Sequence, residues 1–166
     1  MRTLFTAVRG LIYATGFIFL WGWVALRLRL MDVYFGQLPE PLQPVGIVLM
    51  ALGAIVALAC VGTFILRGQG TPAPFDAPRV FVATGPYRYV RNPMYTGAVA
   101  FLAGYGFYSG STSILLFAPL WFALAHVFVV LYEEPALLGR FDGAYVDYCK
   151  RVSRWMPHRP GADGYK

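Results

Sequence analysis

Long uncharged runs separated by short polar connections set the pattern of this chain. Residues 10–26, 41–66 and 92–132 contain no Asp, Glu, Lys or Arg, and these runs are 17, 26 and 41 residues long. The hydrocarbon core of a bilayer is about 30 Å thick and takes about 20 helical residues. The first two runs therefore predict membrane-spanning helices at about residues 10–28 and 44–66.

The third run is too long for a single crossing. As one helix it would extend about 60 Å at 1.5 Å per residue, which is twice the hydrocarbon thickness. The small polar stretch at residues 109–113 marks where the chain reverses. The run therefore predicts two further spans, at about residues 93–108 and 114–132. The expected fold is all-α and polytopic, with four membrane spans and both termini on one side.

The C-terminal segment has a different pattern. Apolar residues recur there at steps of three or four, with charged residues between them, which is typical of an amphipathic helix. These residues are Leu137, Leu138, Phe141, Tyr145, Tyr148, Val152 and Trp155. We expect a helix at about residues 135–154 that lies on, or folds against, the membrane face. Residues 1–166 then form a single membrane-embedded domain.

The composition agrees with a membrane protein. Apolar residues make up 58% of the chain and charged residues 13%, whereas a soluble domain has about 25% charged residues. The two cysteines, Cys60 and Cys149, have neither metal-ligand spacing nor the pairing of a secreted scaffold, so we expect no metal site. In so apolar a chain, the net charge of +6 predicts contact with lipid headgroups rather than with nucleic acid.

The basic residues predict the orientation. In the four-span arrangement, the N-terminus, the loop at residues 67–91 and the C-terminal segment hold twelve Lys and Arg, and the other connections hold two. Cytoplasmic connections are the ones enriched in Lys and Arg. Both termini and the long loop are therefore expected on the cytoplasmic side of a multi-pass integral membrane protein. These segments are also polar enough to build a site.

One candidate site lies at the start of the third span. Asn92 followed by Pro93 is typical of a helix N-cap with proline at the first helical position. The positive end of that helix, together with Arg88 and Arg91, would attract a carboxylate or phosphate. The alternative is an ordinary capped helix whose arginines serve only topology.

A second candidate is the acidic pair Glu133 and Glu134 before Pro135. Two adjacent carboxylates at a helix C-terminus repel each other and oppose the helix dipole unless a cation meets them. Alternatively, Pro135 begins the next helix, where acidic residues are favourable. His126 lies two turns earlier on the same face and is expected to face the bundle interior, where a structural hydrogen bond is favoured over a role as a ligand or base.

A basic helix end and an acidic pair on one membrane face describe a site for a molecule that carries both signs of charge. S-adenosylmethionine is such a molecule, because it carries a carboxylate, an ammonium group and a sulfonium. The residues by themselves indicate only a mixed-charge ligand at the membrane face.

Three ordered motifs in residues 67–157 resemble the integral-membrane methyltransferases. They are the run from Gly85 to Gly97, the Gly104-Tyr105-Gly106 triplet, and the Glu133-Glu134 pair followed by a closing Arg154-Trp155-Met156-Pro157. That superfamily joins isoprenylcysteine carboxyl methyltransferases and phospholipid N-methyltransferases. The motifs are specific for the superfamily and not for a substrate.

The resemblance implies a pocket for S-adenosylmethionine and transfer of its methyl group to a lipophilic acceptor. It places Arg154 near the acceptor and assigns catalytic roles to Arg154 and Glu133. The implied cofactor-binding residues are Tyr87, Arg91, Asn92, Pro93, Tyr95, Gly104, Gly106, Glu133 and Glu134. The carboxyl methyltransferases often have histidine at the position of Asn92, so a role that needs that imidazole does not transfer.

The acceptor stays open among three chemical classes. A carboxylate of the isoprenylcysteine type would need a positioning cation such as Arg154, whereas a phospholipid amine must lose a proton to Glu133, Glu134 or His126. A small thiol would need its thiolate stabilised. Outside the methyltransferases, the alternatives are a small transporter or non-enzymatic membrane subunit, and a membrane reductase. No Gly-x-Gly-x-x-Gly sequence supports the reductase.

Overall fold

The computed structural model describes residues 2–36, 38, 42–68 and 80–157, and within these ranges it contains helices but no strand. The all-α class is therefore confirmed. In chain order the helices are α1 (Arg2–Arg29), α2 (Asp32–Phe35), α3 (Gln43–Thr63), the π-helix η2 (Phe64–Gly68), the 3-10 helix η4 (Gly85–Arg88), α4 (Pro93–Ser109), α5 (Thr112–Phe128), the π-helix η5 (Val129–Glu133) and α6 (Glu134–Arg151).

Two helices in the described residues are long and apolar enough to cross a membrane. They are Gln43–Arg67, formed by α3 and η2, and Thr112–Arg151, formed by α5, η5 and α6. Large apolar side chains lie exposed on the surface of the bundle, among them Phe19 (77%), Leu58 (70%) and Leu131 (73%). Exposure of such residues suits contact with lipid. The four spans and the interfacial position of α6 remain predictions.

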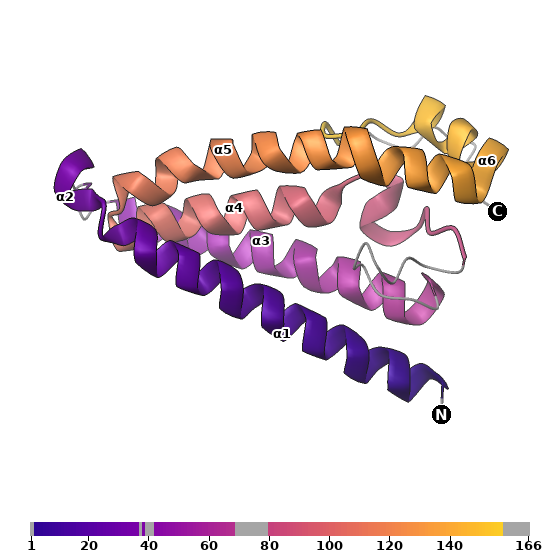
Figure 1. The fold of residues 1–166 in the computed structure, drawn as a ribbon, viewed down its shortest axis with the longest axis horizontal. Helices are drawn as coiled ribbons and strands as arrows, with labels where there is room; N and C mark the ends of the chain where they lie inside the picture. The colour runs from indigo at the N-terminus through magenta and orange to yellow at the C-terminus, as the bar shows by residue number, and fades with distance from the viewer. Residues whose placement is uncertain (1, 37, 39–41, 69–79, 158–166) are drawn as a thin grey trace.

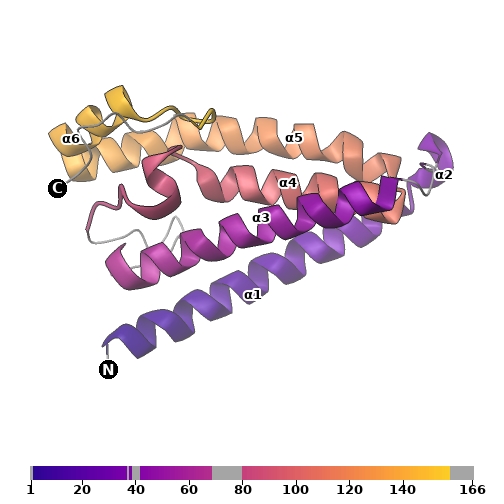
Figure 2. The same cartoon turned by 180° about the vertical axis from the view of Figure 1, so that it is seen from behind.

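The helices lie roughly side by side in an elongated bundle (Figures 1 and 2). The small helix α2 lies at one end, and α6 lies at the other together with the beginning of α1 (Figure 1). The later part of α1 packs on α5 through Trp21, whose ring lies 5.6 Å from Trp121 and 6.1 Å from Phe117. Towards its beginning, α1 diverges from the rest of the bundle (Figure 2).

Glycine allows α3 and α4 to pack closely. A Cβ atom on Gly53 of α3 would collide with the backbone oxygen of Gly97 and lie 2.7 Å from the backbone nitrogen of Phe101. A Cβ atom on Gly104 of α4 would lie 2.7 Å from the backbone nitrogen of Met50. Only a residue without a side chain lets the two backbones approach this closely. The contact fixes α4, which begins at the candidate site, against α3.

The reversal expected at residues 109–113 is confirmed. Gly110 ends α4 with φ 65°, a left-handed conformation that glycine adopts without strain. Ser111 is the N-cap of α5, and its hydroxyl accepts a hydrogen bond from the Ile114 amide at 3.3 Å. Asp32 of α2 reinforces this cap, because its Oδ1 accepts from the Ser111 hydroxyl at 3.0 Å and from the Ser113 amide at 2.9 Å.

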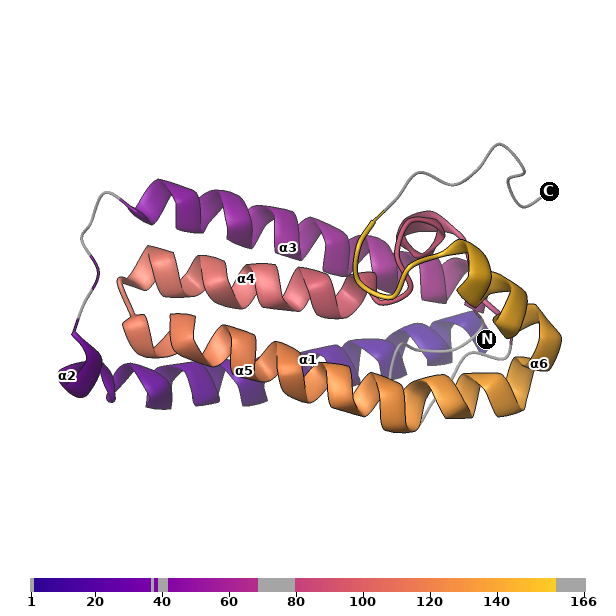
Figure 3. The ribbon, with the colours of Figure 1, turned by 90° about the horizontal axis from the view of Figure 1, so that it is seen from above.

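The connection from α5 to α6 differs from the expectation. The sequence predicts a span ending at residue 132 and a separate helix from residue 135, whereas the structure stays helical across this junction. The break comes at Asp142, whose φ of 41° and ψ of −122° are not helical. After Asp142 the chain turns back over the end of the bundle (Figures 1 and 3). This turn brings Ser153 and Arg154 to the start of α4.

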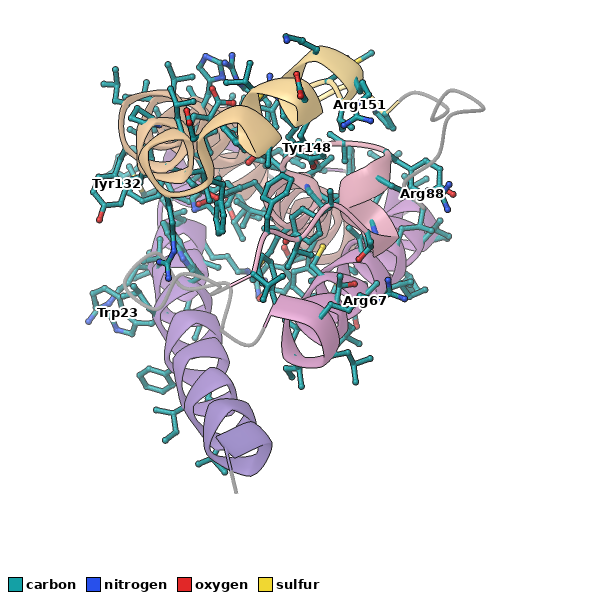
Figure 4. All side chains as sticks on the ribbon, turned by 90° about the vertical axis from the view of Figure 1, so that its right-hand side faces the viewer. Trp23, Arg67, Arg88, Tyr132, Tyr148 and Arg151 are labelled. Atoms are coloured by element: carbon teal, nitrogen blue, oxygen red, sulfur yellow. The ribbon has the colours of Figure 1, made fainter. Side chains whose placement is uncertain are left out.

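One face of α6 packs against protein. Tyr145 and Tyr148 are buried with Ala83 and Val152, and Phe81 packs against this cluster. The ring of Phe81 lies 5.1 Å from that of Tyr148 in an edge-to-face arrangement. Figure 4 shows Tyr148 pointing inward from α6. The periodic apolar residues thus attach α6 to the segment that precedes the candidate site.

Substitution of Gly53 tests the contact between α3 and α4. Gly53→Ala is expected to lower the free energy of unfolding by about 1–3 kcal/mol, because the added methyl group forces the backbones apart. Gly62→Ala on the same helix is the matched control, since no described atom beyond its own part of the helix lies within 4 Å of that position. Thermal unfolding in detergent measures both. Equal melting temperatures for the two variants would contradict this packing role.

The stability of the protein at acid pH tests the contribution of ionised Asp32 to the fold. Burial raises the pKa of this carboxyl, but hydrogen bonds from Ser113 and Ser111 and the nearby charge of Arg29 outweigh burial, so the pKa lies below its ordinary value of 3.8. Ionised Asp32 therefore stabilises the fold at neutral pH, and this contribution disappears as the pH falls below about 4. Asp32→Asn should lower the melting temperature at pH 7 and flatten its decline between about pH 5 and pH 3. If the melting temperatures of wild type and variant fell in parallel with pH, ionised Asp32 would not contribute to stability in this way.

Candidate functional site

The start of α4 has the predicted cap position but not the predicted cap bond. Asn92 is the N-cap residue and Pro93 occupies the first turn, yet the Asn92 side chain does not cap the helix. Its Nδ2 instead donates to the backbone oxygen of Arg154 at 3.3 Å. The first backbone amides of α4 are therefore left without a side-chain cap, and such amides attract anions.

Glu134 lies between two arginines at this end of the bundle. Arg154 donates from Nε to Oε1 and from Nη2 to Oε2, both at 2.8 Å, which is a bidentate pair. Arg91 Nη1 lies 2.9 Å from Oε1 of the same carboxylate. The exposed fractions of the side chains are 17% for Glu134, 14% for Arg91 and 32% for Arg154. The hydrogen bonds to Glu134 raise the pKa of Arg154, so its charge is secure.

Glu133 faces a different neighbour. Its Oε2 accepts a hydrogen bond from the Tyr95 hydroxyl of α4 at 2.8 Å. Among the residues that the structure describes, no Lys or Arg forms an ion pair with Glu133. The two adjacent acids thus have separate environments, one with two cations and one with a phenol.

The residues after α6 lie across the start of α4. We call residues 152–157 the tail strap. The backbone oxygen of Ser153 accepts from the Arg91 amide at 2.9 Å, and Arg154 supplies both the carbonyl for Asn92 and the guanidinium for Glu134. Trp155 Nε1 donates to His126 Nδ1 of α5 at 2.9 Å. His126 thus has the structural hydrogen bond that its position suggested.

Tyr87 is buried in the packing between η4 and α3. Its ring lies 5.2 Å from that of Phe64, and Cys60 and Val82 belong to the same cluster. Its backbone oxygen accepts from the Tyr148 hydroxyl at 2.6 Å. Burial raises the pKa of the Tyr87 phenol well above its usual range, so this phenol stays neutral. Tyr87 supports the loop before Arg91.

The structure does not bring Gly104 and Gly106 to this cluster. They lie more than ten residues beyond Asn92 along α4, which is about 18 Å at 1.5 Å per residue. Gly104 packs against the backbone of α3, and a Cβ atom on Gly106 would lie 2.7 Å from Leu115 of α5. Helix packing accounts for both glycines. The other residues named for the site, Arg91, Asn92, Pro93, Tyr95, Glu133, Glu134 and Arg154, come together at one end of the bundle.

A cavity of about 530 Å³ adjoins the charged cluster. Its polar lining includes Arg91, Glu134 and Cys149. Its apolar lining includes Leu138 and Val146, whose side chains are 45% and 37% exposed. The cavity therefore joins charged groups to an apolar surface, which suits a ligand with a polar head and a hydrocarbon part.

Sequence reasoning missed Cys149 and Tyr145 as residues of the cavity wall. Arg91 Nη1 donates to Cys149 Sγ at 2.8 Å. The spacing held a signal, because Tyr145 and Cys149 are four residues apart on a helix and share a face. In the described part of the chain, no group of three or more His, Cys, Asp or Glu is placed to hold a metal ion. That the protein needs no metal stays a prediction.

A comparison with protein families identifies the family of this chain. A model of the phospholipid methyltransferase family matches residues 42–143, which is more than half of the chain. The chain belongs to this family. A comparison with curated proteins and another with solved structures gave no match. With its two long apolar helices, the chain is a membrane methyltransferase, and methyltransferases of this kind generally use S-adenosylmethionine.

The family match includes some residues of the cluster and leaves out others. Arg91, Tyr95, Glu133 and Glu134 lie within residues 42–143, and the whole tail strap follows the matched region. The contacts of the strap are therefore known from the structure of this chain and not from the family.

The two cysteines provide a test of the cavity. Cys149 lines it and is partly exposed, whereas Cys60 is fully buried at 0%. In detergent, a maleimide should modify Cys149 at least tenfold faster than Cys60, because modification requires access. Peptide mass spectrometry after timed labelling measures both rates, and Cys149→Ser is the control. Equal rates, or faster labelling of Cys60, would show that the cavity wall is assigned wrongly.

Proposed function

We propose that the protein transfers a methyl group from S-adenosylmethionine to a lipid amine at the cytoplasmic face of a membrane. The observation that carries this proposal is the convergence of Arg91 and Arg154 with Glu133 and Glu134 beside an apolar-walled cavity. S-adenosylmethionine has one carboxylate and two cationic groups, so it needs both kinds of partner. The family supplies the reaction type.

The proposed roles follow from the charges. Arg91 and the uncapped amides at the start of α4 suit the carboxylate of the cofactor. Glu134 suits its ammonium group, which would share this carboxylate with the arginines. Asn92, Pro93 and Tyr87 shape the loop, and Tyr95 orients Glu133. We leave Gly104 and Gly106 outside the proposed site because they serve helix packing.

Methyl transfer from a sulfonium is an in-line displacement. The bond from sulfur to the methyl carbon breaks while a bond from the acceptor nitrogen to that carbon forms, and S-adenosylhomocysteine leaves. The donor is already activated, so the protein chiefly aligns the two molecules and excludes water, effects worth up to several kcal/mol. An ammonium acceptor must first lose a proton, and Glu133 is the carboxylate to accept it.

The contacts of Arg154 favour an amine over a carboxylate as acceptor. The sequence suggests Arg154 as a cation that positions an acceptor carboxylate, but its guanidinium already makes two bonds to Glu134. Glu133, by contrast, accepts its hydrogen bond from a phenol and forms no ion pair with a described Lys or Arg, so it suits a cationic acceptor. The phospholipid methyltransferase family agrees with a lipid amine. The isoprenylcysteine-type carboxylate and the small thiol become outcomes of the test.

The membrane orientation is part of the proposal. The basic residues favour a cytoplasmic site. The beginning of α1 and the charged cluster at α6 lie at the same end of the bundle, as a cytoplasmic N-terminus requires (Figure 1).

Binding of S-adenosylhomocysteine to the purified full chain tests the site. Isothermal titration should show binding to wild type and at least tenfold weaker binding to Glu134→Gln, which removes the charge between the two arginines. Asp147→Asn is the matched control, because it removes one carboxylate from an exposed pair on the same helix. The ligand should also slow maleimide labelling of Cys149. A folded wild-type protein that shows neither heat nor protection would refute the cofactor assignment.

Methyl-labelled S-adenosylmethionine identifies the acceptor. Vesicles containing phosphatidylethanolamine should yield labelled lipid, whereas farnesylcysteine and a small alkyl thiol should not. Glu133→Gln is expected to reduce the maximal rate at least 100-fold, in the range of general acid-base catalysis, with little change in cofactor binding. Label appearing in farnesylcysteine alone, or in a volatile sulfide alone, would replace the amine with that acceptor.

A further inference from the structure

Trp155 connects the tail strap to the interior of the bundle. Its indole Nε1 donates to His126 Nδ1 at 2.9 Å. Its ring lies 4.7 Å from that of Phe122 and 6.4 Å from that of Tyr95. The side chain is thus inserted between α4 and α5, the two helices that carry Tyr95 and lead to the acidic pair.

The hydrogen bond from Trp155 to His126 is the polar contact that the inserted indole makes. Both groups lie among aromatic side chains, so each would lose a partner in weakly polar surroundings if the bond broke. An unpaired polar group in such surroundings is unfavourable. The bond therefore selects one position of the Trp155 ring and of the backbone beside it.

The neighbouring residue in the strap is the one that holds Glu134. Arg154 makes its bidentate pair with Glu134 and offers its carbonyl to Asn92. A shift of Trp155 would move Arg154 as well, because the two are adjacent in the chain. His126 is thus linked to Glu134 through two adjacent residues of the tail strap.

We propose that His126 is a positioning residue: it holds the tail strap through Trp155, and the strap in turn holds Arg154 on Glu134 in the cofactor site. This inference rests on the proposed function for the identity of the ligand, but not for the contact itself. His126 takes no part in proton transfer in this scheme. It sets the affinity of the site for the methyl donor and leaves the chemical step nearly unchanged.

Four variants separate this role from general stability. His126→Phe keeps a ring and removes the acceptor, whereas His126→Asn keeps an acceptor close to the position of Nδ1. Trp155→Phe keeps a ring and removes the donor. The double variant His126→Phe with Trp155→Phe tests whether the two residues act as a unit. Met156→Ala is a control within the strap, because Met156 is 76% exposed.

The kinetic measurement uses the purified full chain with the methyl donor and the acceptor found above. His126→Phe and Trp155→Phe should each raise KM for S-adenosylmethionine and Kd for S-adenosylhomocysteine about five- to tenfold, the size of one net hydrogen bond. The value of kcat should change less than about twofold. The double variant should be no worse than either single one, and His126→Asn should recover most of the affinity. Additive effects, equal losses in His126→Asn and His126→Phe, or a fall in kcat alone would overturn the proposal.

Hydrogen exchange gives a readout that needs no ligand. The amides of residues 152–156 should exchange about tenfold faster in His126→Phe than in wild type, and at nearly the wild-type rate in His126→Asn. Unchanged exchange in His126→Phe would refute the positioning role even if the protein binds the cofactor. Faster exchange in a protein that binds no S-adenosylhomocysteine would retain the strap contact and reject the proposed function.

Discussion

The ion pairs of Glu134 are the interaction on which this end of the bundle depends. They join three parts of the chain at one carboxylate: the loop before α4, the start of α6 and the tail strap. A carboxylate with 17% of its side chain exposed is costly without partners, and two guanidinium groups offset that cost. Loss of Glu134 would leave two guanidinium groups close together in a poorly hydrated place with no carboxylate between them. The positions of these three segments and the charge balance of the cluster therefore depend on the same contacts.

Helix geometry directs the two adjacent acids, Glu133 and Glu134, to different partners. Successive residues on a helix point about 100° apart. Glu133 consequently turns to Tyr95 of α4, and Glu134 turns to the arginines. Their repulsion is reduced because each carboxylate has its own hydrogen-bond donors. In the proposed reaction, this division assigns binding to one acid and proton transfer to the other.

Much of the fold is predictable because the signals are local. The uncharged runs place the helices, and the polar stretch at residues 109–113 places the reversal. Asn92 with Pro93 places the start of α4, although the amide of Asn92 binds the tail strap instead of its own helix. Local chemistry identifies a helix end, but it does not reveal which distant group competes for the side chain.

The strap contacts were not predictable, because they depend on the turn at Asp142. A non-glycine residue with φ of 41° is uncommon, and no pattern of apolar residues reports it. Without that turn, Trp155 would not return to His126 on α5. The same turn places Cys149 beside Arg91, which the polar setting of Cys149 in the sequence did not suggest. Gly104 and Gly106 were assigned to the cofactor by resemblance, while their surroundings in the bundle explain them by packing.

The glycine-mediated contact between α3 and α4 has a mechanical consequence. Backbones that touch directly have no side chains between them to rearrange, so this helix pair behaves as one rigid body. The rest of the charged end, α6 and the tail strap, is joined to it mainly by side-chain bonds, which break and re-form more easily. Under the proposed function, a lipid acceptor would therefore enter by a shift of α6 and the tail strap, with the non-helical residue Asp142 as the point of bending, rather than by separation of α3 from α4.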